Sequence, residues 1–250
     1  MLLKKWEDMP EVMKNDYTYT YYKKLENRKI SLIIKRLFDI LFSLALLILF
    51  SPIFLILAVL IKLDSKGPIF YRQERVTQYN KTFKIFKFRT MVANADKIGS
   101  LITLGSDSRI TRIGKIIRKF RLDEVPQLIN ILTGDMSFVG TRPEVRKYVD
   151  NYSDEMKATL LMPAGVTSEA SINFKDEDEI VNTYISKGKA VDDIYINRIL
   201  PQKMKYNLEY VENFKIINDA KICLKTIIAV IKPNRNKELE NKEDKIKLEV

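Results

Sequence analysis

A run of 22 residues without a charged side chain, residues 40–61, constrains this chain more than any other feature of its sequence. As a continuous helix the run would be about 33 Å long, which matches the hydrocarbon core of a bilayer. It begins too far into the chain, and is too long, for the apolar part of a cleaved signal peptide. The run therefore predicts a segment that enters a membrane.

The centre and the flanks of this run bear on how it enters the membrane. Pro52 removes one helical hydrogen bond, which predicts a kink, and Ser51 offers a hydroxyl to a carbonyl that the proline frees. Basic residues flank both ends of the run: Lys35, Arg36, Lys62 and Lys66. The run alone leaves a spanning helix, a re-entrant hairpin and a buried core helix open. Because both flanks prefer the cytoplasm under the positive-inside rule, they favour a re-entrant hairpin that bends at Ser51-Pro52.

Composition restricts the chemistry. The chain has a formal net charge of +11, no histidine and one cysteine, Cys223. A Ser-His-Asp or Cys-His mechanism, a disulfide framework and a His- or Cys-built zinc site are therefore excluded for this chain. Carboxylates would have to carry acid–base or nucleophilic chemistry, with a hard cation such as Mg²⁺ as the metal. The positive charge indicates a polyanionic partner, and the apolar run favours an anionic membrane surface or phosphorylated substrates over nucleic acid.

The remaining sequence predicts a mainly helical α+β fold. Residues 1–30 are polar and Tyr-rich without a sustained helical period, which indicates a leader. Residues 31–66 would form the re-entrant membrane helix, with Lys35, Arg36 and Asp39 at the level of the headgroups. Residues 67–231 would form a cytoplasmic catalytic domain, and residues 232–250 a charged tail.

Within the catalytic domain, aromatic and β-branched residues at 69–71 and 83–89 predict a small β-hairpin around residues 77–82. Apolar residues at helical spacing over 110–120, and again over 199–231, predict amphipathic helices at the membrane interface. The segment 134–144 is expected to be a loop, and residues 163–165 a turn.

The candidate active site is the pair Asp123 and Glu124. Asp123 is expected to cap the next helix, with Pro126 in its first turn and Gly134 just past its end. Acidic residues at this position commonly do no more than complement the helix dipole. The alternative is a nucleophilic carboxylate beside a phosphoryl group that the same positive field holds.

Arginines cluster before this pair. Arg109, Arg112 and Arg118 are candidate phosphate ligands because a guanidinium matches phosphate oxygens with two parallel hydrogen bonds. A basic face resting on anionic lipid would explain the same residues. Arg142 precedes a rigid proline in the following loop, and no Walker A or Rossmann glycine pattern occurs.

Motifs in a fixed order connect these features: KRLFD (35–39), the Ser51-Pro52 break, DSKGPIF (64–70), RQERV (72–76), FKFRTM (86–91), RITRIG (109–114), LDEVPQL (122–128) and GDMSFVG (134–140). In this order and spacing, the chain resembles the bacterial sugar transferase family, the monotopic polyisoprenyl-phosphate phosphoglycosyl transferases. The resemblance covers roughly residues 33–230.

The resemblance implies transfer of a phosphosugar from a UDP-sugar to undecaprenyl (polyprenyl) phosphate, with release of UMP, as the first membrane step of surface glycan assembly. Asp123 would be the nucleophile and a ligand of Mg²⁺, and Glu124 a general base or a support of the metal. Arg118 and Arg142 match the family's phosphate-binding arginines, and Arg89, Arg109 and Arg112 are further candidates. The implied location is the inner membrane of a bacterium, with the catalytic domain on the cytoplasmic face.

Two stretches depart from the family pattern. Thr141 replaces the first proline of the usual Pro-Arg-Pro, and residues 166–172 differ from the commoner Gly-Leu-Ala-Gln version, so the sugar or acceptor preference is expected to differ. A non-catalytic scaffold that binds anionic lipid is the alternative function, and a nucleic-acid binder is disfavoured. The sequence leaves a homo-oligomer open.

Overall fold

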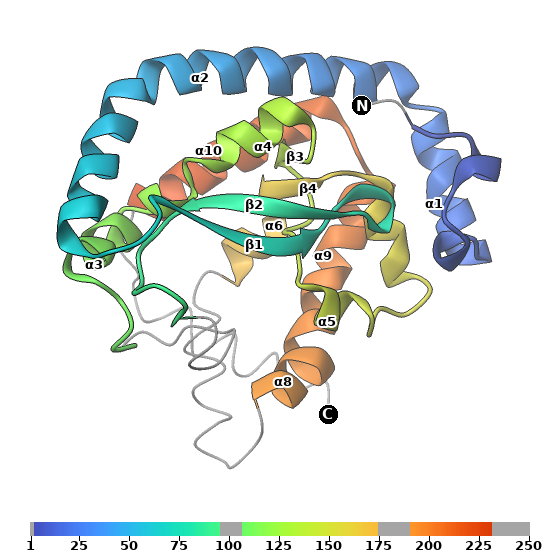
Figure 1. Ribbon diagram of the computed structural model, residues 1–250. Coiled ribbons are helices and arrows are strands. Elements are labelled where there is room, and N and C mark those ends of the chain that lie inside the picture. Colours follow the sequence, from blue (N-terminus) through green and yellow to red (C-terminus); the bar gives the residue numbers. More distant parts are fainter. Residues whose placement is uncertain (1–2, 96–106, 175–190, 232–250) are drawn as a thin grey trace.

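The computed structural model describes residues 3–95, 107–174 and 191–231, so the predicted charged tail at 232–250 lies outside the described residues. One long helix, α2 (Lys29–Asp64), arches over the rest of the molecule and bends downward at one end (Figure 1). Shorter helices and two small sheets fill the space beneath this arch. The described part of the chain therefore confirms the predicted mainly helical α+β class.

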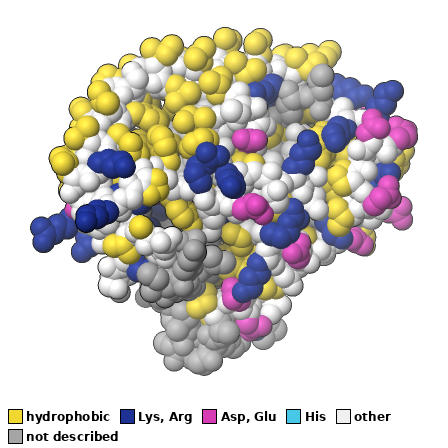
Figure 2. All heavy atoms as spheres, in the orientation of Figure 1, with side chains coloured by type: hydrophobic (Ala, Val, Ile, Leu, Met, Phe, Trp, Pro, Cys, Tyr) yellow, Lys and Arg dark blue, Asp and Glu magenta, His cyan; other side chains and the backbone are white. Residues whose placement is uncertain are grey.

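Pro52 lies inside α2, and the helix continues through it. The Ser51 hydroxyl donates a 2.8 Å hydrogen bond to the Ile48 carbonyl, the helical acceptor that Pro52 leaves without a donor. Among the described residues, α2 is the one helix long and apolar enough to cross a membrane. Hydrophobic side chains cover its outer face (Figure 2), and Ile48 and Leu55 are 67% and 68% exposed.

The inner face of α2 is fastened to the domain by charged side chains. Lys35 donates to the Val139 carbonyl at 2.9 Å and pairs with Asp219. Asp39 accepts from the Ser137 hydroxyl and from the Phe138 amide, at 3.0 and 3.1 Å. The expectation that Lys35 and Asp39 lie at the headgroups is wrong, because both are buried against the domain.

Arg36, the third residue expected at the headgroups, also has a different role. It donates to the carbonyls of Ile131 and Leu132 at 2.6 and 2.9 Å. These carbonyls lie in the last turn of α4 (Gln127–Thr133), where helical acceptors lack helical donors. Arg36 therefore caps the helix that begins beside the candidate carboxylates.

Two sheets lie beneath α2. Strands β1 (Phe70–Val76) and β2 (Thr82–Phe88) form the predicted antiparallel hairpin, and η3 (Gln78–Asn80) makes its turn. A second, parallel pair, β3 (Met136–Val139) and β4 (Ala164–Thr167), was not predicted. The expected loop and turn are wrong there, since β3 lies within 134–144 and β4 begins inside 163–165.

Glycine permits a close approach beside the parallel pair. A Cβ added at Gly165 would lie 2.1 Å from the Gly140 amide nitrogen. Both positions therefore require glycine, which brings the end of β3 against β4.

The remaining helices surround the sheets. They are α3 (Arg112–Lys119), η5 (Leu122–Glu124), α5 (Arg146–Val149), η6 (Met156–Leu161), α6 (Glu169–Asn173), α8 (Val191–Ile194), η7 (Tyr195–Ile199), α9 (Leu200–Glu212) and α10 (Ile216–Ile231). The region 199–231 contains two helices, α9 and α10, which confirms the predicted helices, and their place at a membrane interface stays a prediction.

The N-terminal segment also folds. It contains η1 (Trp6–Asp8), η2 (Glu11–Met13) and α1 (Asp16–Glu26), and Asn15 caps α1 by accepting from the Thr18 amide at 2.8 Å. Met13, Tyr22 and Leu25 are buried in the largest hydrophobic cluster, together with residues of η6 and α9. The helical period of α1 is not visible in the sequence because a tyrosine can be buried like an apolar residue or exposed like a polar one.

Candidate active site

The carboxylates Asp123 and Glu124 lie in η5, a short 3₁₀ turn between α3 and α4. Arg121 precedes this turn with φ of 55°, a left-handed conformation that separates it from α3. The expectation that Asp123 caps α4 is wrong, because Pro126 occupies the N-cap position and no side chain caps the helix. Gly134 ends α4 in the left-handed conformation, as predicted.

Contacts from three directions position η5. Asp64, the last residue of α2, accepts from the Ile113 amide at 3.0 Å and so caps the start of α3. Asn130 fastens α4 along β2 by accepting from the Phe86 amide at 2.8 Å and donating to the Lys84 carbonyl at 3.1 Å. With Arg36 at the far end of α4, these contacts hold η5 between the membrane helix and the hairpin.

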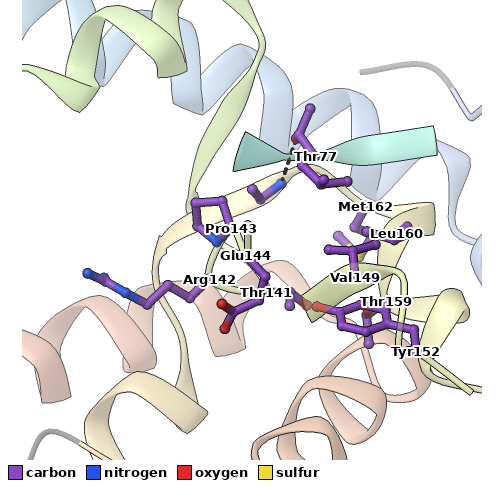
Figure 3. Close-up of a pocket in the computed structure, with 12 residues that line it drawn as sticks. Thr77, Thr141, Arg142, Pro143, Glu144, Val149, Tyr152, Thr159, Leu160 and Met162 are labelled. Carbon is purple, nitrogen blue, oxygen red and sulfur yellow. Dashed lines mark hydrogen bonds between the residues drawn. The ribbon is translucent and has the colours of Figure 1, made fainter. Parts of the chain in front are cut away.

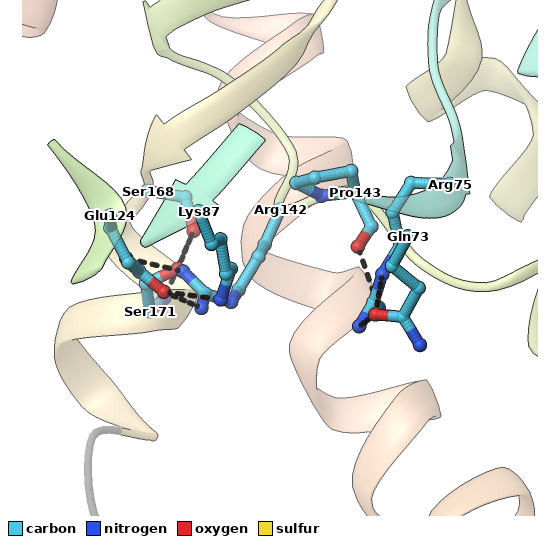
Figure 4. A network of polar contacts seen from close by, with 8 residues as sticks. All are labelled: Gln73, Arg75, Lys87, Glu124, Arg142, Pro143, Ser168 and Ser171. Atoms are coloured by element: carbon cyan, nitrogen blue, oxygen red, sulfur yellow. Dashed lines mark hydrogen bonds and ion pairs between the residues drawn. The ribbon is translucent and has the colours of Figure 1, made fainter. Parts of the chain in front are cut away.

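Glu124 is held by two cations. One of its oxygens accepts from Lys87 Nζ at 2.9 Å and from Arg142 Nη2 at 2.6 Å, and its second oxygen lies 3.5 Å from Arg142 Nη1 (Figure 4). Burial opposes ionisation, but the charges of Arg142 and Lys87 outweigh it and hold the pKa of Glu124 well below its usual range. Glu124 is therefore a stable anion with both oxygens in use.

Asp123 is in the opposite electrostatic state. Burial raises the pKa of its carboxyl, the charge of Glu124 adds to the shift, and the nearby charges of Lys87, Arg118 and Arg121 act against it. Its Oδ1 is buried without a hydrogen-bond partner among the described residues. A buried carboxylate oxygen with no protein partner is unusual outside a functional site.

The loop after β3 presents Arg142. The Thr141 carbonyl accepts from the Gly165 amide at 2.8 Å, and the Glu144 carbonyl accepts from the Val76 amide at 2.9 Å. Thr141 stands where the family usually has a proline, and the Gly165 contact holds its peptide.

A small hollow, with room for about one water molecule, lies behind this loop (Figure 3). Its polar lining comes from Thr77, Thr141, Arg142, Glu144, Tyr152 and Thr159. Thr141 Oγ1 is buried there without a partner among the described residues. The backbone contacts of Thr141 and Glu144 hold the loop that carries Arg142.

The other predicted phosphate ligands lie in different settings. Arg89 is buried at the end of α2, where its Nη2 donates to the carbonyls of Ile61 and Ser65 at 3.2 and 2.6 Å. Arg109 forms a forked pair with Asp107, which lowers the pKa of Asp107 to about 2.

Two predicted phosphate ligands belong to α3. Arg118 is partly buried and its charge acts on Asp123, whereas Arg112 is exposed. The structure thus brings Arg142 and Arg118 toward the carboxylates, while Arg89 and Arg109 engage partners elsewhere. Substrate binding by all five arginines stays a prediction.

The carboxylates also bear on the predicted metal. In the ranges that the structure describes, no cluster of three or more His, Cys, Asp or Glu residues is arranged to hold a metal ion. Mg²⁺ in phosphoryl-transfer sites is usually held by one or two carboxylates together with water and substrate phosphates. Asp123 fits that pattern because its Oδ1 has no protein partner, whereas Lys87 and Arg142 engage Glu124.

Sequence reasoning missed Lys87 and Arg75. Lys87 contacts Glu124 directly, and Arg75 donates to the Pro143 carbonyl at 3.2 Å. The sequence signal that could have found them is their position in the two predicted strands. Alternate residues of a strand share one face, so Lys87 and Arg75 could have been assigned to one face of the hairpin.

A family model described as bacterial sugar transferase matches residues 30–233. The UDP-N-acetylgalactosamine-undecaprenyl-phosphate N-acetylgalactosaminephosphotransferase of Aeromonas hydrophila is 38% identical over 201 residues, which are 79% of this chain and 44% of that protein. The exopolysaccharide production protein ExoY of Sinorhizobium fredii is 33% identical over 218 residues, which are 81% of this chain and 88% of that protein.

A third relative is the putative undecaprenyl-phosphate N-acetylgalactosaminyl 1-phosphate transferase of Bacillus subtilis. It is 43% identical over 125 residues, which are 50% of this chain and 70% of that protein. The chain therefore spans less than half of the Aeromonas protein and most of the Sinorhizobium protein. With a family model matched from residue 30 to residue 233, the chain belongs to the bacterial sugar transferase family.

Proposed function

We propose that the protein transfers a phosphosugar from a UDP-sugar to undecaprenyl phosphate, releasing UMP. The printed functions of the Aeromonas and Bacillus relatives support these substrate classes. The observation that carries the proposal is the contrast between two adjacent carboxylates. Asp123 has a raised pKa and an unpartnered oxygen, and Glu124 is clamped between Lys87 and Arg142.

Asp123 is the nucleophile in this proposal. Its carboxylate attacks the β-phosphorus, a bond forms between carboxylate oxygen and phosphorus, and the bond from that phosphorus to the bridging oxygen breaks. UMP leaves with the bridging oxygen. An oxygen of the lipid phosphate then attacks the same phosphorus, and the carboxylate of Asp123 leaves.

Glu124 acts as a positioning anion. A general base needs a pKa near the working pH, and the pKa of Glu124 lies far below it. The carboxylate instead orients Lys87 and Arg142 as ligands of phosphate oxygens. This favours support of the site over proton transfer as the role of Glu124.

Mg²⁺ at Asp123 would neutralise the charge of the two phosphates when it is bound. Arg118, whose charge acts on Asp123, is proposed as a further phosphate ligand. Arg112, on the exposed side of the same helix, is proposed to meet lipid or substrate phosphate at the membrane surface.

The membrane segment is proposed to be re-entrant on the cytoplasmic face of a bacterial inner membrane. The proline inside α2 and the downward bend at one end of this helix (Figure 1) support a hairpin that enters and leaves one leaflet. Exposed apolar side chains on α3 and α10 support contact of these helices with the same interface: Ile116, Phe120, Ile217, Leu224 and Ile227. Such an arrangement presents a lipid phosphate and a soluble UDP-sugar to Asp123 from one side.

UMP release is the direct test of this function. Purified protein with Mg²⁺ and undecaprenyl phosphate is offered a panel of UDP-sugars that includes UDP-N-acetylgalactosamine. Turnover with at least one sugar, lost in Asp123→Asn and kept in Glu74→Gln, supports the proposal. Binding to anionic vesicles without turnover on any UDP-sugar would favour a scaffold instead.

A further inference from the structure

Arg75 engages the peptide that follows Arg142. Strand β1 places Gln73 and Arg75 on the same face, and Gln73 Oε1 accepts from Arg75 Nε and Nη2 at 3.0 and 2.6 Å. The remaining arm of the guanidinium, Nη1, donates to the Pro143 carbonyl at 3.2 Å (Figure 4). All three nitrogens of the guanidinium thus have partners within the protein, and Arg75 is committed to the loop.

The charge of a buried anion, Glu144, acts on Arg75. Glu144 is 6% exposed and accepts from the Tyr195 hydroxyl at 2.5 Å and from Lys203 Nζ at 3.3 Å. Burial would raise the pKa of Glu144, but the charges of Lys203 and Arg75 outweigh it and lower the pKa. Glu144, Tyr195 and Lys203 therefore form a second polar cluster, which links the loop to η7 and α9 and attracts Arg75.

The two clusters leave little freedom to the loop between them. Backbone hydrogen bonds fix the peptides of Thr141 and Glu144, and Arg75 fixes that of Pro143. Arg142 is the residue between these anchors, and its guanidinium reaches Glu124. Burial lowers the pKa of Arg75, the charge of Glu144 opposes this shift, and the like charge of Arg142 adds to it. The 2.6 Å ion pair with Glu124 directs the Arg142 side chain toward the carboxylates.

We propose that Arg75 is a positioning residue that aims Arg142 at the phosphates of the donor by holding the Pro143 carbonyl from behind. This proposal rests on the proposed function. Arg75 contacts no substrate, and its effect passes through Arg142. A purely structural Arg75 would affect folding, and its effect on phosphate recognition would not depend on Arg142.

A double-mutant cycle separates these roles. Arg75→Gln should lower kcat/KM for the UDP-sugar by about 10- to 100-fold, because small misplacements of a binding group are costly. In an Arg142→Gln background the same change should alter kcat/KM by less than about twofold. Arg75→Lys keeps the positive charge near Glu144 but cannot bond Gln73 and Pro143 at the same time as the guanidinium does. Its kcat/KM should therefore lie between those of the wild-type protein and Arg75→Gln.

Two further variants keep the experiment decisive. Arg72→Gln removes a charge from an exposed position of the same strand, where the guanidinium stacks on Phe86, and should leave kcat/KM unchanged. If Arg75→Gln does not fold, Gln73→Ala removes the acceptor of Arg75 Nε and Nη2 while keeping the charge of Arg75. Its effect on kcat/KM should likewise be present with Arg142 and absent in the Arg142→Gln background.

Binding of pyrophosphate, measured by thermal shift, separates failure of this proposal from failure of the proposed function. If the wild-type protein releases no UMP, the proposed function is wrong. Pyrophosphate binding by the single and double variants of Arg75 and Arg142 still tests the role of Arg75. Pyrophosphate should raise the melting temperature of the wild-type protein. Arg75→Gln should reduce this rise when Arg142 is present, and should change it little in the Arg142→Gln background. Equal effects of Arg75→Gln in both backgrounds, on kcat/KM and on pyrophosphate binding, would overturn the proposal.

Discussion

The Ser51 hydroxyl donates to the Ile48 carbonyl at 2.8 Å, and this carbonyl is the one that Pro52 deprives of its helical donor. The bond explains how α2 continues through a proline in an apolar segment. Without water nearby, a free carbonyl in lipid would cost several kcal/mol. The predicted bend at Ser51-Pro52 thus has its freed carbonyl satisfied locally.

Topology labelling tests the role of this bend. In a Cys223→Ser background, single cysteines at Ile30→Cys and Lys66→Cys should both react with a membrane-impermeant reagent from the cytoplasmic side. Pro52→Ala supplies the missing amide donor to Ile48 and should straighten the helix. The label at residue 66 should then become inaccessible from that side in a fraction of the molecules. Labelling of residues 30 and 66 from opposite sides in the unmodified helix would show a spanning segment.

Lys87 supplies the second cation on Glu124. Lys87→Gln removes a charge at 2.9 Å from the Glu124 carboxylate, so kcat/KM for the UDP-sugar should fall by about 10²-fold, the typical effect of losing one preorganised donor. Lys84→Gln, on the exposed face of the same strand, is the matched control and should retain activity. Similar rates in both variants would remove Lys87 from the site.

The raised pKa of Asp123 has a consequence for stability. Because the folded state binds this proton more tightly than the unfolded state, the ionised carboxylate lowers the free energy of unfolding at neutral pH. Asp123→Asn should therefore raise the melting temperature at pH 7 while abolishing turnover. The gain should shrink as pH falls through the raised pKa of Asp123 and should vanish below its ordinary value of 3.8. A melting temperature at pH 7 equal to or below that of the wild-type protein would contradict this account.

The pH dependence of activity should reflect the ionisation of Asp123. Asp123 attacks as the anion, so log kcat/KM should decline with acid below its raised pKa, at a pH above the ordinary 3.8. Glu124 has a lowered pKa and should remain ionised throughout that decline. A pH profile of UMP release locates this decline at low pH. If Glu124→Gln shows the same decline, the decline belongs to Asp123.

The buried pair Lys35 and Asp219 ties α2 to the domain. The side chains are 3% and 12% exposed, so Lys35→Met leaves an unpaired buried carboxylate and should cost about 3–5 kcal/mol. The double variant Lys35→Met/Asp219→Leu removes both charges and should be less destabilised than Lys35→Met alone. Lys29→Met, at an exposed pair, should change the stability little. Thermal unfolding in detergent compares the four proteins.

The sequence predicts a feature well where one strong physical signal dominates. The 22-residue apolar run predicts the long apolar helix α2, because few soluble structures bury such a segment. The aromatic and β-branched residues at 69–71 and 83–89 predict the hairpin, and the absence of histidine directs attention to Asp123 and Glu124. Each of these signals is local in the chain.

Features that depend on distant contacts were not predictable in the same way. Lys35 and Asp39 look like headgroup residues until β3 and α10 supply their partners. Strands β3 and β4 have four residues each, too few to show a period, and they pair across an intervening segment. Asp123 was expected to cap a helix, but it lies in η5, and the N-cap of α4 is Pro126.

Trapping the first half-reaction tests the central claim most directly. Wild-type protein is incubated with Mg²⁺ and a UDP-sugar radiolabelled at the β-phosphorus, without lipid acceptor, and both UMP release and protein-bound label are measured. The account predicts a stoichiometric burst of UMP with label on the protein, chased from it by undecaprenyl phosphate, and neither signal in Asp123→Asn. Release of UMP by Asp123→Asn at near wild-type rate would contradict it.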